Sequence, residues 1–176
     1  MGEEISMKTI LYMATSITGK TTSGSADTTW VEESDVERMD ALMTRCGVMV
    51  MGKTTYESFG DDLPLGKALL VVMTHDKDLL AKNQDGLIFT ASSPKEVLNM
   101  LESKGYQEVM LAGGESLNSA FLSDNLVDEI RIIVKPIVIG QGKSLFNVPK
   151  DVSLKLLNNT RLENGSIELS YEVLTN

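Results

Sequence analysis

Cysteine and long apolar runs are nearly absent from this sequence. Cys46 is the one cysteine in 176 residues, so no disulfide can form within the chain and nothing indicates an oxidising compartment. No apolar run approaches the roughly 20 residues of a transmembrane helix, and the N-terminus lacks the apolar core of a signal peptide. We therefore expect a cytoplasmic protein with no membrane partner.

Basic residues are also few. Lys and Arg number 16 against 25 Asp and Glu, which gives a net charge of −9. Such a balance argues against a nucleic-acid partner or an anionic membrane surface. Small anions remain possible ligands, because a local cluster of backbone N–H groups and lysines can act inside an acidic protein.

The length and composition fit one globular domain. Hydrophobic residues make up 42% and charged residues 23% of the chain, which is ordinary for a soluble fold with its own core. We expect residues 1–6 to be an N-terminal leader and residues 7–176 to form a single domain. Gly2 fits the minimal myristoylation pattern, but an unstructured leader is the preferred interpretation.

Strands and helices alternate along the first 129 residues, and strands then follow one another. The predicted strands are Lys8–Met13, Val48–Met51, Ala68–Met73, Leu87–Thr90 and Val109–Ala112. Helices are predicted after Ser34, an N-cap with Glu37 three residues later, over Thr54–Phe59, and after the capping box Ser93-Pro94-Lys95-Glu96. Asn164-Gly165 predicts a tight turn between strands at 152–159 and 166–174. The fold class is therefore α/β, with a mostly parallel central sheet, flanking helices and a C-terminal antiparallel β-hairpin.

A paired glycine follows the fifth predicted strand. Gly113 and Gly114 leave no side chain at the turn, and Leu117, Ala120 and Phe121 then have helical spacing. A strand, a glycine turn and a helix N-terminus expose free N–H groups and the positive end of a helix dipole, which suits a phosphate. A plain turn is the alternative interpretation, since glycine pairs are common turn formers.

A second glycine segment matches the P-loop pattern by letter. Gly47 to Thr54 reads G-x-x-x-x-G-K-T, but the four variable residues of a P-loop form a loop after the strand. Here Val48 to Met51 are apolar and must be the strand itself, so an NTPase is disfavoured. Gly52, Lys53, Thr54 and Thr55 instead form a strand–glycine–helix turn with N–H groups, two hydroxyls and an ammonium.

The C-terminal half carries a long, ordered resemblance to a known family. The positions are Gly113-Gly114, Leu126 to Glu129, Pro136, Gly140, Gly142, Leu145 and Phe146. They resemble the C-terminal reductase domain of bacterial riboflavin-biosynthesis deaminase-reductases, which has a dihydrofolate reductase-like fold. Val48 to Ser58 is similar to a cofactor-binding signature of dihydrofolate reductases. The partner of that reductase domain, a zinc deaminase with Cys and His ligands, has no counterpart in a chain with one Cys and one His, and we expect no metal site.

The resemblance implies NADPH as cofactor and assigns its contacts. Backbone groups of Gly113, Gly114, Glu115, Ser116 and Leu117 would contact the pyrophosphate. Gly52, Lys53, Thr54 and Thr55 would serve the adenosine side, Thr74 and His75 the 2′-phosphate, and Ala14 and Gly19 the nicotinamide.

The catalytic end matches the family less well. The loop from Ala14 to Lys20 has Thr18 where the family usually carries Asp, and Ser16 and Thr18 are the catalytic candidates of this loop. Asp35 falls near the carboxylate with which dihydrofolate reductases grip the pterin. A helix-capping or solvated carboxylate is the alternative for Asp35.

These features predict an NADPH-dependent reductase that transfers a hydride to a small heterocyclic or ribosylamino substrate. The alternatives are dihydrofolate reductase activity, or a nucleotide-binding module of the same fold without turnover. We also expect a homodimer, because the apolar run Ile130–Ile139 is long enough to need cover from a second copy.

Overall fold

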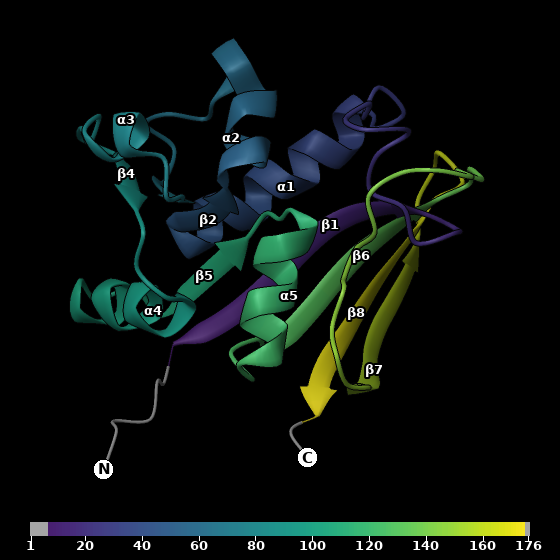
Figure 1. The fold of residues 1–176 in the computed structure, drawn as a ribbon. Helices are drawn as coiled ribbons and strands as arrows, with labels where there is room; N and C mark the ends of the chain where they lie inside the picture. Colours follow the sequence, from purple (N-terminus) through teal and green to yellow (C-terminus); the bar gives the residue numbers. More distant parts are fainter. Residues whose placement is uncertain (1–6, 175–176) are drawn as a thin grey trace.

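An eight-stranded sheet forms the centre of the molecule in the computed structural model, which describes residues 7–174 (Figure 1). The predicted leader and the myristoylation pattern lie outside these residues. The strand order is β4-β3-β2-β5-β1-β6-β8-β7. The strands are β1 Lys8–Ser16, β2 Val48–Gly52, β3 Leu69–Met73, β4 Leu87–Thr90, β5 Glu108–Leu111, β6 Glu129–Lys135, β7 Ser153–Arg161 and β8 Ile167–Leu174.

Parallel pairing extends from β4 to β6, and β8 then runs antiparallel to both β6 and β7. The predicted fold class, a mostly parallel sheet that ends in an antiparallel hairpin, is confirmed. Gly165 lies at the predicted hairpin turn with φ +82°, a left-handed conformation that glycine adopts without a steric cost.

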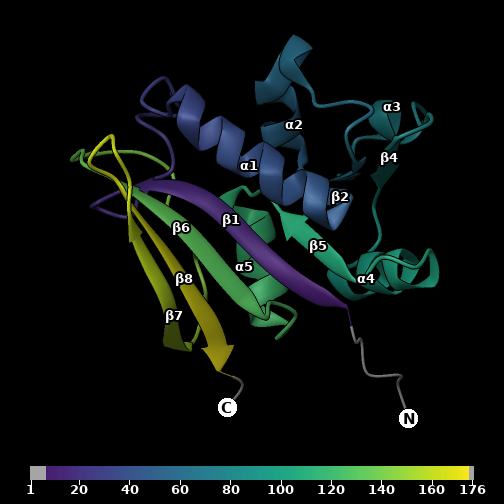
Figure 2. The same ribbon diagram turned by 180° about the vertical axis from the view of Figure 1, so that it is seen from behind.

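Helices cover both faces of the sheet. They are α1 Glu33–Cys46, α2 Lys53–Phe59, α3 Lys77–Leu80, α4 Pro94–Ser103 and α5 Glu115–Ser123, and a 3-10 turn spans Gly60–Asp62. Figure 1 shows α4 and α5 in front of the sheet, and Figure 2 shows α1 on the opposite face. No helix within residues 7–174 has both the length and the apolar character needed to cross a membrane.

Alternation along the strands builds two cores. Side chains of β1, β2 and β3 such as Leu11, Val50 and Val71 pack with α4 and α5 on one face. Their neighbours in sequence point the other way, where they pack with Leu42 and Met43 of α1. A strand that is buried on both faces must be continuously apolar, and this explains why these strands could be located in the sequence.

The start of α1 differs from the prediction. Ser34 is not the N-cap: the helix begins at Glu33 after Glu32, and the Glu32 N–H donates to Asp35 Oδ2 at 3.0 Å. Val36 in the first turn of the helix is 44% exposed. The prediction of Ser34 as N-cap was wrong because Glu32 and Asp35, two residues earlier, have the same spacing as Ser34 and Glu37 and form the capping box instead.

Two apolar segments can be compared with their predictions. Val48 to Met51 form a strand, β2, rather than a phosphate-cradling loop, as expected for a false P-loop match. The run Ile130–Ile139 is divided: β6 ends at Lys135 and lies between β1 and β8, and Val138 beyond the strand is 69% exposed. The homodimer stays a prediction.

Two long loops meet beside the sheet. Residues 17–30 and 137–152 are joined by backbone hydrogen bonds from Thr21 N–H to Lys143 O at 2.9 Å and from Gly24 N–H to Gln141 O at 2.9 Å. Gly142 makes this approach possible, because a Cβ there would lie 1.8 Å from the carbonyl oxygen of Thr22.

Candidate functional site

A cavity of about 620 Å³ opens at the carboxyl edge of the parallel strands. Its walls come from the residues that follow β2, β3, β4 and β5, from α5, and from the two joined loops. Ligands of open α/β sheets bind at this edge, near the point where the strand order reverses. Here β3 and β4 lie on one side of β2, and the next strand along the chain, β5, lies on its other side, between β2 and β1. The strand order therefore reverses at β2 and β5, and the cavity lies at that point.

Most of the predicted cofactor residues line the cavity. They are Gly52, Lys53, Thr54, Thr55, Thr74, His75, Gly114, Glu115, Ser116 and Leu117. Ala14, Gly19 and Gly113 do not line it. Gly113 lies directly behind the wall, where a Cβ would come within 2.7 Å of Met13 Sδ, and Met13 itself is part of the lining.

The glycine turn presents backbone amides to the cavity. Gly113 has φ +85°, the Gly113–Gly114 peptide is cis, and α5 begins at Glu115. The first intrahelical donor is Asn118, whose N–H bonds to Gly114 O at 2.9 Å. The amides of residues 115–117 therefore have no backbone acceptor in the first turn. These N–H groups and the helix dipole are suited to hold an anion.

The two glycine turns are fastened to each other. Gly52 N–H donates to Gly113 O at 2.8 Å, and a Cβ on Gly114 would meet only Thr55 Oγ1, at 3.7 Å. The start of α2 and the start of α5 thus face the same space, and their hydroxyls and amides can serve one elongated ligand.

Lys53 is held at one edge of this space. Its Nζ lies 2.5 Å from Asp76 Oδ2 and 3.6 Å from Glu57 Oε1. The hydrogen bond to Asp76 raises the pKa of Lys53, and the same bond lowers the pKa of Asp76. Asp76 also caps α3, a short helix that the sequence did not predict, through the N–H groups of residues 78 and 79.

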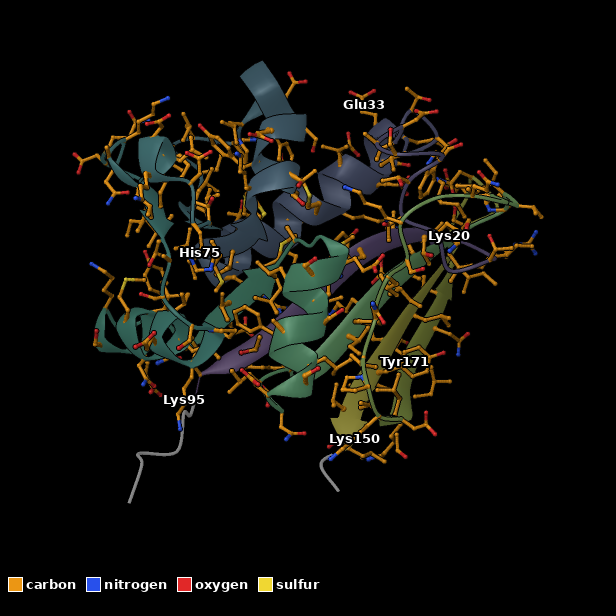
Figure 3. The ribbon with its side chains drawn as sticks, viewed as in Figure 1. Lys20, Glu33, His75, Lys95, Lys150 and Tyr171 are labelled. Atoms are coloured by element: carbon orange, nitrogen blue, oxygen red, sulfur yellow. The ribbon has the colours of Figure 1, made fainter. Side chains whose placement is uncertain are left out.

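His75 and Thr74 lie beside this ion pair. Thr74 is buried and accepts a hydrogen bond from Asp76 N–H at 3.1 Å, whereas His75 is exposed. Figure 3 shows His75 and Lys20 on opposite sides of α5. The cavity therefore has a His75 end, near α3 and β4, and a loop end, where residues 17–30 meet residues 137–152.

Lys143 supplies positive charge at the loop end. Lys143 is one of the lining residues, and its N–H donates to Thr22 Oγ1 at 3.0 Å. No acidic side chain within residues 7–174 forms an ion pair with it, in contrast to Lys53. Nearby, the Glu115 carboxylate accepts a hydrogen bond from Ser144 N–H at 2.6 Å, which ties the start of α5 to this loop.

The catalytic candidates of the first loop lie outside the lining. Ser16 is buried, and its hydroxyl bonds to Thr18 Oγ1 at 2.9 Å and to Lys20 N–H at 3.0 Å. Thr18 Oγ1 also donates to Ile139 O at 2.7 Å. In this arrangement the two hydroxyls hold the loop against residues 137–152, so their predicted catalytic role stays a prediction without a contact at the cavity.

Asp35 also lies outside the lining, in a buried ion pair. Its Oδ2 is 2.7 Å from Lys135 Nζ, both residues are less than 5% exposed, and Lys135 also contacts Glu32 at 2.7 Å. Burial lowers the pKa of Lys135, but the hydrogen bonds to Asp35 and Glu32 outweigh it and raise the pKa. Asp35 Oδ1 is buried with no partner among the described residues.

Sequence reasoning missed the rest of the lining: Met13, Thr21, Thr22, Ala26, Thr28, Ser58, Met73, Thr90, Ala91, Ser92, Ala112, Ala120, Phe121 and Lys143. Some could have been found, because Thr90 to Ser92 follow β4 as Thr74 follows β3, at the same edge of the sheet. The loop residues carried no signal, since their place depends on pairing over about 120 positions. Within residues 7–174 no group of three His, Cys, Asp or Glu side chains could hold a metal ion.

Comparisons with known proteins agree with this architecture. A family model for the RibD C-terminal domain matches residues 7–167. The Bacillus subtilis protein YyaP is 25% identical over 175 residues, which cover 92% of this chain and 93% of YyaP.

Two solved structures share the fold at low identity. One is the Thermotoga maritima diaminohydroxyphosphoribosylaminopyrimidine deaminase/5-amino-6-(5-phosphoribosylamino)uracil reductase, with a TM-score of 0.75 and 15% identity over 96% of this chain and 57% of that chain. The other is dihydrofolate reductase from Enterococcus faecalis, complexed with NADP(H), with a TM-score of 0.73 and 14% identity over 94% of this chain and 96% of that chain. Both matches support the dihydrofolate reductase-like fold.

Proposed function

Because this chain belongs to the RibD C-terminal domain family, we propose that it is an NADPH-dependent reductase acting on a small heterocyclic substrate that carries a ribosylamino group. The family and the fold make it a reductase-type domain that resembles enzymes of riboflavin biosynthesis. The cofactor and the substrate are the proposal. One observation carries it: Gly114 and the first residues of α5, whose amides lack a backbone acceptor, line a cavity of about 620 Å³, a volume typical of ligand sites.

The donor set at the cavity fits a dinucleotide. The amides of residues 115–117 would hold the pyrophosphate, and the open space over Gly114 leaves room for its oxygens, because only Thr55 Oγ1 comes near. Thr54 and Thr55 would add hydroxyl donors from α2, with Thr74 and His75 beside the adenosine ribose. In this arrangement the dinucleotide would lie along the carboxyl edge of β2 and β5.

The loop end of the cavity suits the substrate. The nicotinamide supplies the hydride when it is bound. Thr21, Thr22 and Met13 would enclose the reacting ring and exclude water. The ammonium of Lys143, which forms no ion pair within residues 7–174, would attract a phosphate on the substrate. A substrate of the 5-amino-6-(5-phosphoribosylamino)uracil type has both the flat ring and the phosphate that these groups would accommodate.

The dihydrofolate alternative receives less support from the side chains. It depends on Asp35 as a carboxylate available to a pterin, whereas Asp35 pairs with Lys135 and does not line the cavity. A nucleotide-binding module without turnover stays a second candidate, because neither Ser16 nor Thr18 reaches the cavity wall.

The test is oxidation of NADPH, followed by the loss of nicotinamide absorbance, with the phosphoribosylaminouracil and with dihydrofolate in parallel. We expect turnover with the uracil and none with dihydrofolate. Lys143→Met should raise KM for the phosphorylated substrate and leave NADPH affinity unchanged. NADPH binding without oxidation of either mixture would support the binding module, and no NADPH binding at all would refute the proposal.

A further inference from the structure

Lys53, the lysine at the His75 end of the cavity, is already paired with carboxylates of the protein. Lys53 Nζ contacts Asp76 Oδ2 at 2.5 Å, the shorter of its two ion pairs. Asp76 is fixed from its other oxygen as well, since Oδ1 accepts the N–H groups of Asp78 at 3.0 Å and Leu79 at 3.3 Å. The carboxylate therefore cannot turn away without uncapping α3, whereas the lysine is a long side chain that can.

Among residues 7–174, no other permanent cation lines this end. The lining residues in this range include Lys53 and Lys143 but no arginine, and Lys143 belongs to the loop end. His75 is the remaining basic side chain, and it is exposed. A phosphate monoester placed beside Thr74 would thus meet one ammonium that is shared with a carboxylate.

We infer that Asp76 sets the choice between NADPH and NADH, because it holds Lys53 away from the 2′-phosphate that distinguishes the two cofactors. This inference rests on the proposed function. The carboxylate repels a dianionic 2′-phosphate and competes with it for the ammonium. A 2′-hydroxyl carries no charge and can instead donate a hydrogen bond to an acidic residue. We accordingly expect the wild-type protein to bind both cofactors, with only a small preference for NADPH.

The test is a calorimetric titration of the wild type and Asp76→Asn with NADPH and with NADH. Asparagine keeps the oxygen that caps α3 and is itself a favoured N-cap residue, so the fold is retained. It removes the negative charge and releases Lys53. We expect the ratio of the NADH dissociation constant to the NADPH dissociation constant to rise about tenfold in dilute buffer, from the Coulomb energy of two charges on the phosphate a few ångströms away. Added salt should reduce this rise in the ratio, because it screens the charges.

Two further variants isolate the cause. Glu57→Gln removes the same charge from the same ammonium, but at the longer distance of 3.6 Å and without a role in capping, so its ratio should change less than about threefold. Lys53→Met should lower NADPH affinity. In the Lys53→Met background, Asp76→Asn should raise the ratio of dissociation constants by less than it does in the wild type, because no ammonium is released.

The outcomes separate the inference from the proposed function. A ratio that rises with Asp76→Asn but not with Glu57→Gln supports the role of Asp76. A folded Asp76→Asn protein with the wild-type ratio overturns that role while the proposed function stands. A wild type that binds neither dinucleotide overturns the proposed function, and the inference falls with it. Circular dichroism of each variant confirms that the fold is intact.

Discussion

Gly114→Asp should abolish dinucleotide binding without unfolding the protein. Gly114 has φ −87°, which any residue adopts, and the space that a Cβ would enter holds only Thr55 Oγ1 at 3.7 Å. The new carboxylate would project into the cavity beside the amides of residues 115–117. It would occupy the space proposed for the pyrophosphate and accept the hydrogen bonds that the phosphate needs.

The size of the effect follows from those amides. Hydrogen bonds to charged groups contribute about 1.5–3 kcal/mol each. Losing two of them weakens binding by about two to four orders of magnitude. Charge repulsion between the carboxylate and the pyrophosphate adds to this loss.

Two other glycines provide controls. Gly140→Asp adds the same charge where a Cβ meets nothing within 4 Å and where no cavity wall is formed, so NADPH affinity should stay at the wild-type value. Gly113→Ala should instead lower stability, chiefly because φ at this position is +85°, a backbone conformation that residues with a Cβ rarely adopt; the Met13 side chain would also have to move. Trp30 fluorescence or calorimetry measures affinity, and thermal denaturation followed by circular dichroism reports folding. A folded Gly114→Asp protein that binds NADPH as tightly as the wild type would refute the assignment of the cofactor site.

Four further predictions follow from contacts away from the glycine turn. Asp35→Asn should lower the free energy of unfolding in urea by about 2–4 kcal/mol, because it leaves the buried Lys135 with one charged partner; unchanged stability would contradict this. A lower kcat/KM with an unchanged NADPH dissociation constant is expected only if Asp35 binds the substrate. Gly142→Ala should separate the two loops and weaken NADPH binding about tenfold by calorimetry, because overpacking costs about 1–3 kcal/mol, while a wild-type affinity would show that loop closure is irrelevant. Burial raises the pKa of Glu129, but hydrogen bonds from Arg131 and Lys8 outweigh it and hold the pKa below its ordinary value of 4.5. The stabilisation by the Glu129 carboxylate is full above that value and is lost as pH falls through the lower pKa of the folded state. Acid titration of Glu129→Gln should therefore show a smaller loss of stability than the wild type. Light scattering should give a mass twice 19.2 kDa, with pairing through the exposed edge strand β7, and a clean monomer at micromolar concentration would remove the dimer.

The parts of the fold that could be predicted from the sequence are those with local causes. Strands such as β2 are buried on both faces and therefore read as short continuous apolar runs. The capping box at Ser93 and the hairpin turn at Gly165 were confirmed because each depends on residues within a few positions. The glycine turn before α5 was located for the same reason.

The parts that could not be predicted depend on partners far apart in the chain. Asp35 and Lys135 are 100 positions apart, so no pattern in the sequence shows that the predicted pterin carboxylate is neutralised. Thr18 was judged by its place in a family loop, but its hydroxyl is used to hold Ile139 O across 121 positions. Lys53 lines the cavity, but its ion pair with Asp76 could not be predicted, because Asp76 caps α3, a four-residue helix too short to leave a periodic pattern.

The contrast between amides and lysines explains how a chain with net charge −9 can present an anion site. Backbone N–H groups at the start of α5 are fixed by the helix, and no side chain within residues 7–174 caps them, whereas Lys53 is paired with Asp76. Affinity for the part shared by all dinucleotides, the pyrophosphate, would then come from the backbone. Discrimination between dinucleotides would come from side chains, whose charges the surrounding acidic residues adjust. Under this division, mutations near α2 and α3 change which cofactor binds, whereas mutations at the glycine turn decide whether any cofactor binds.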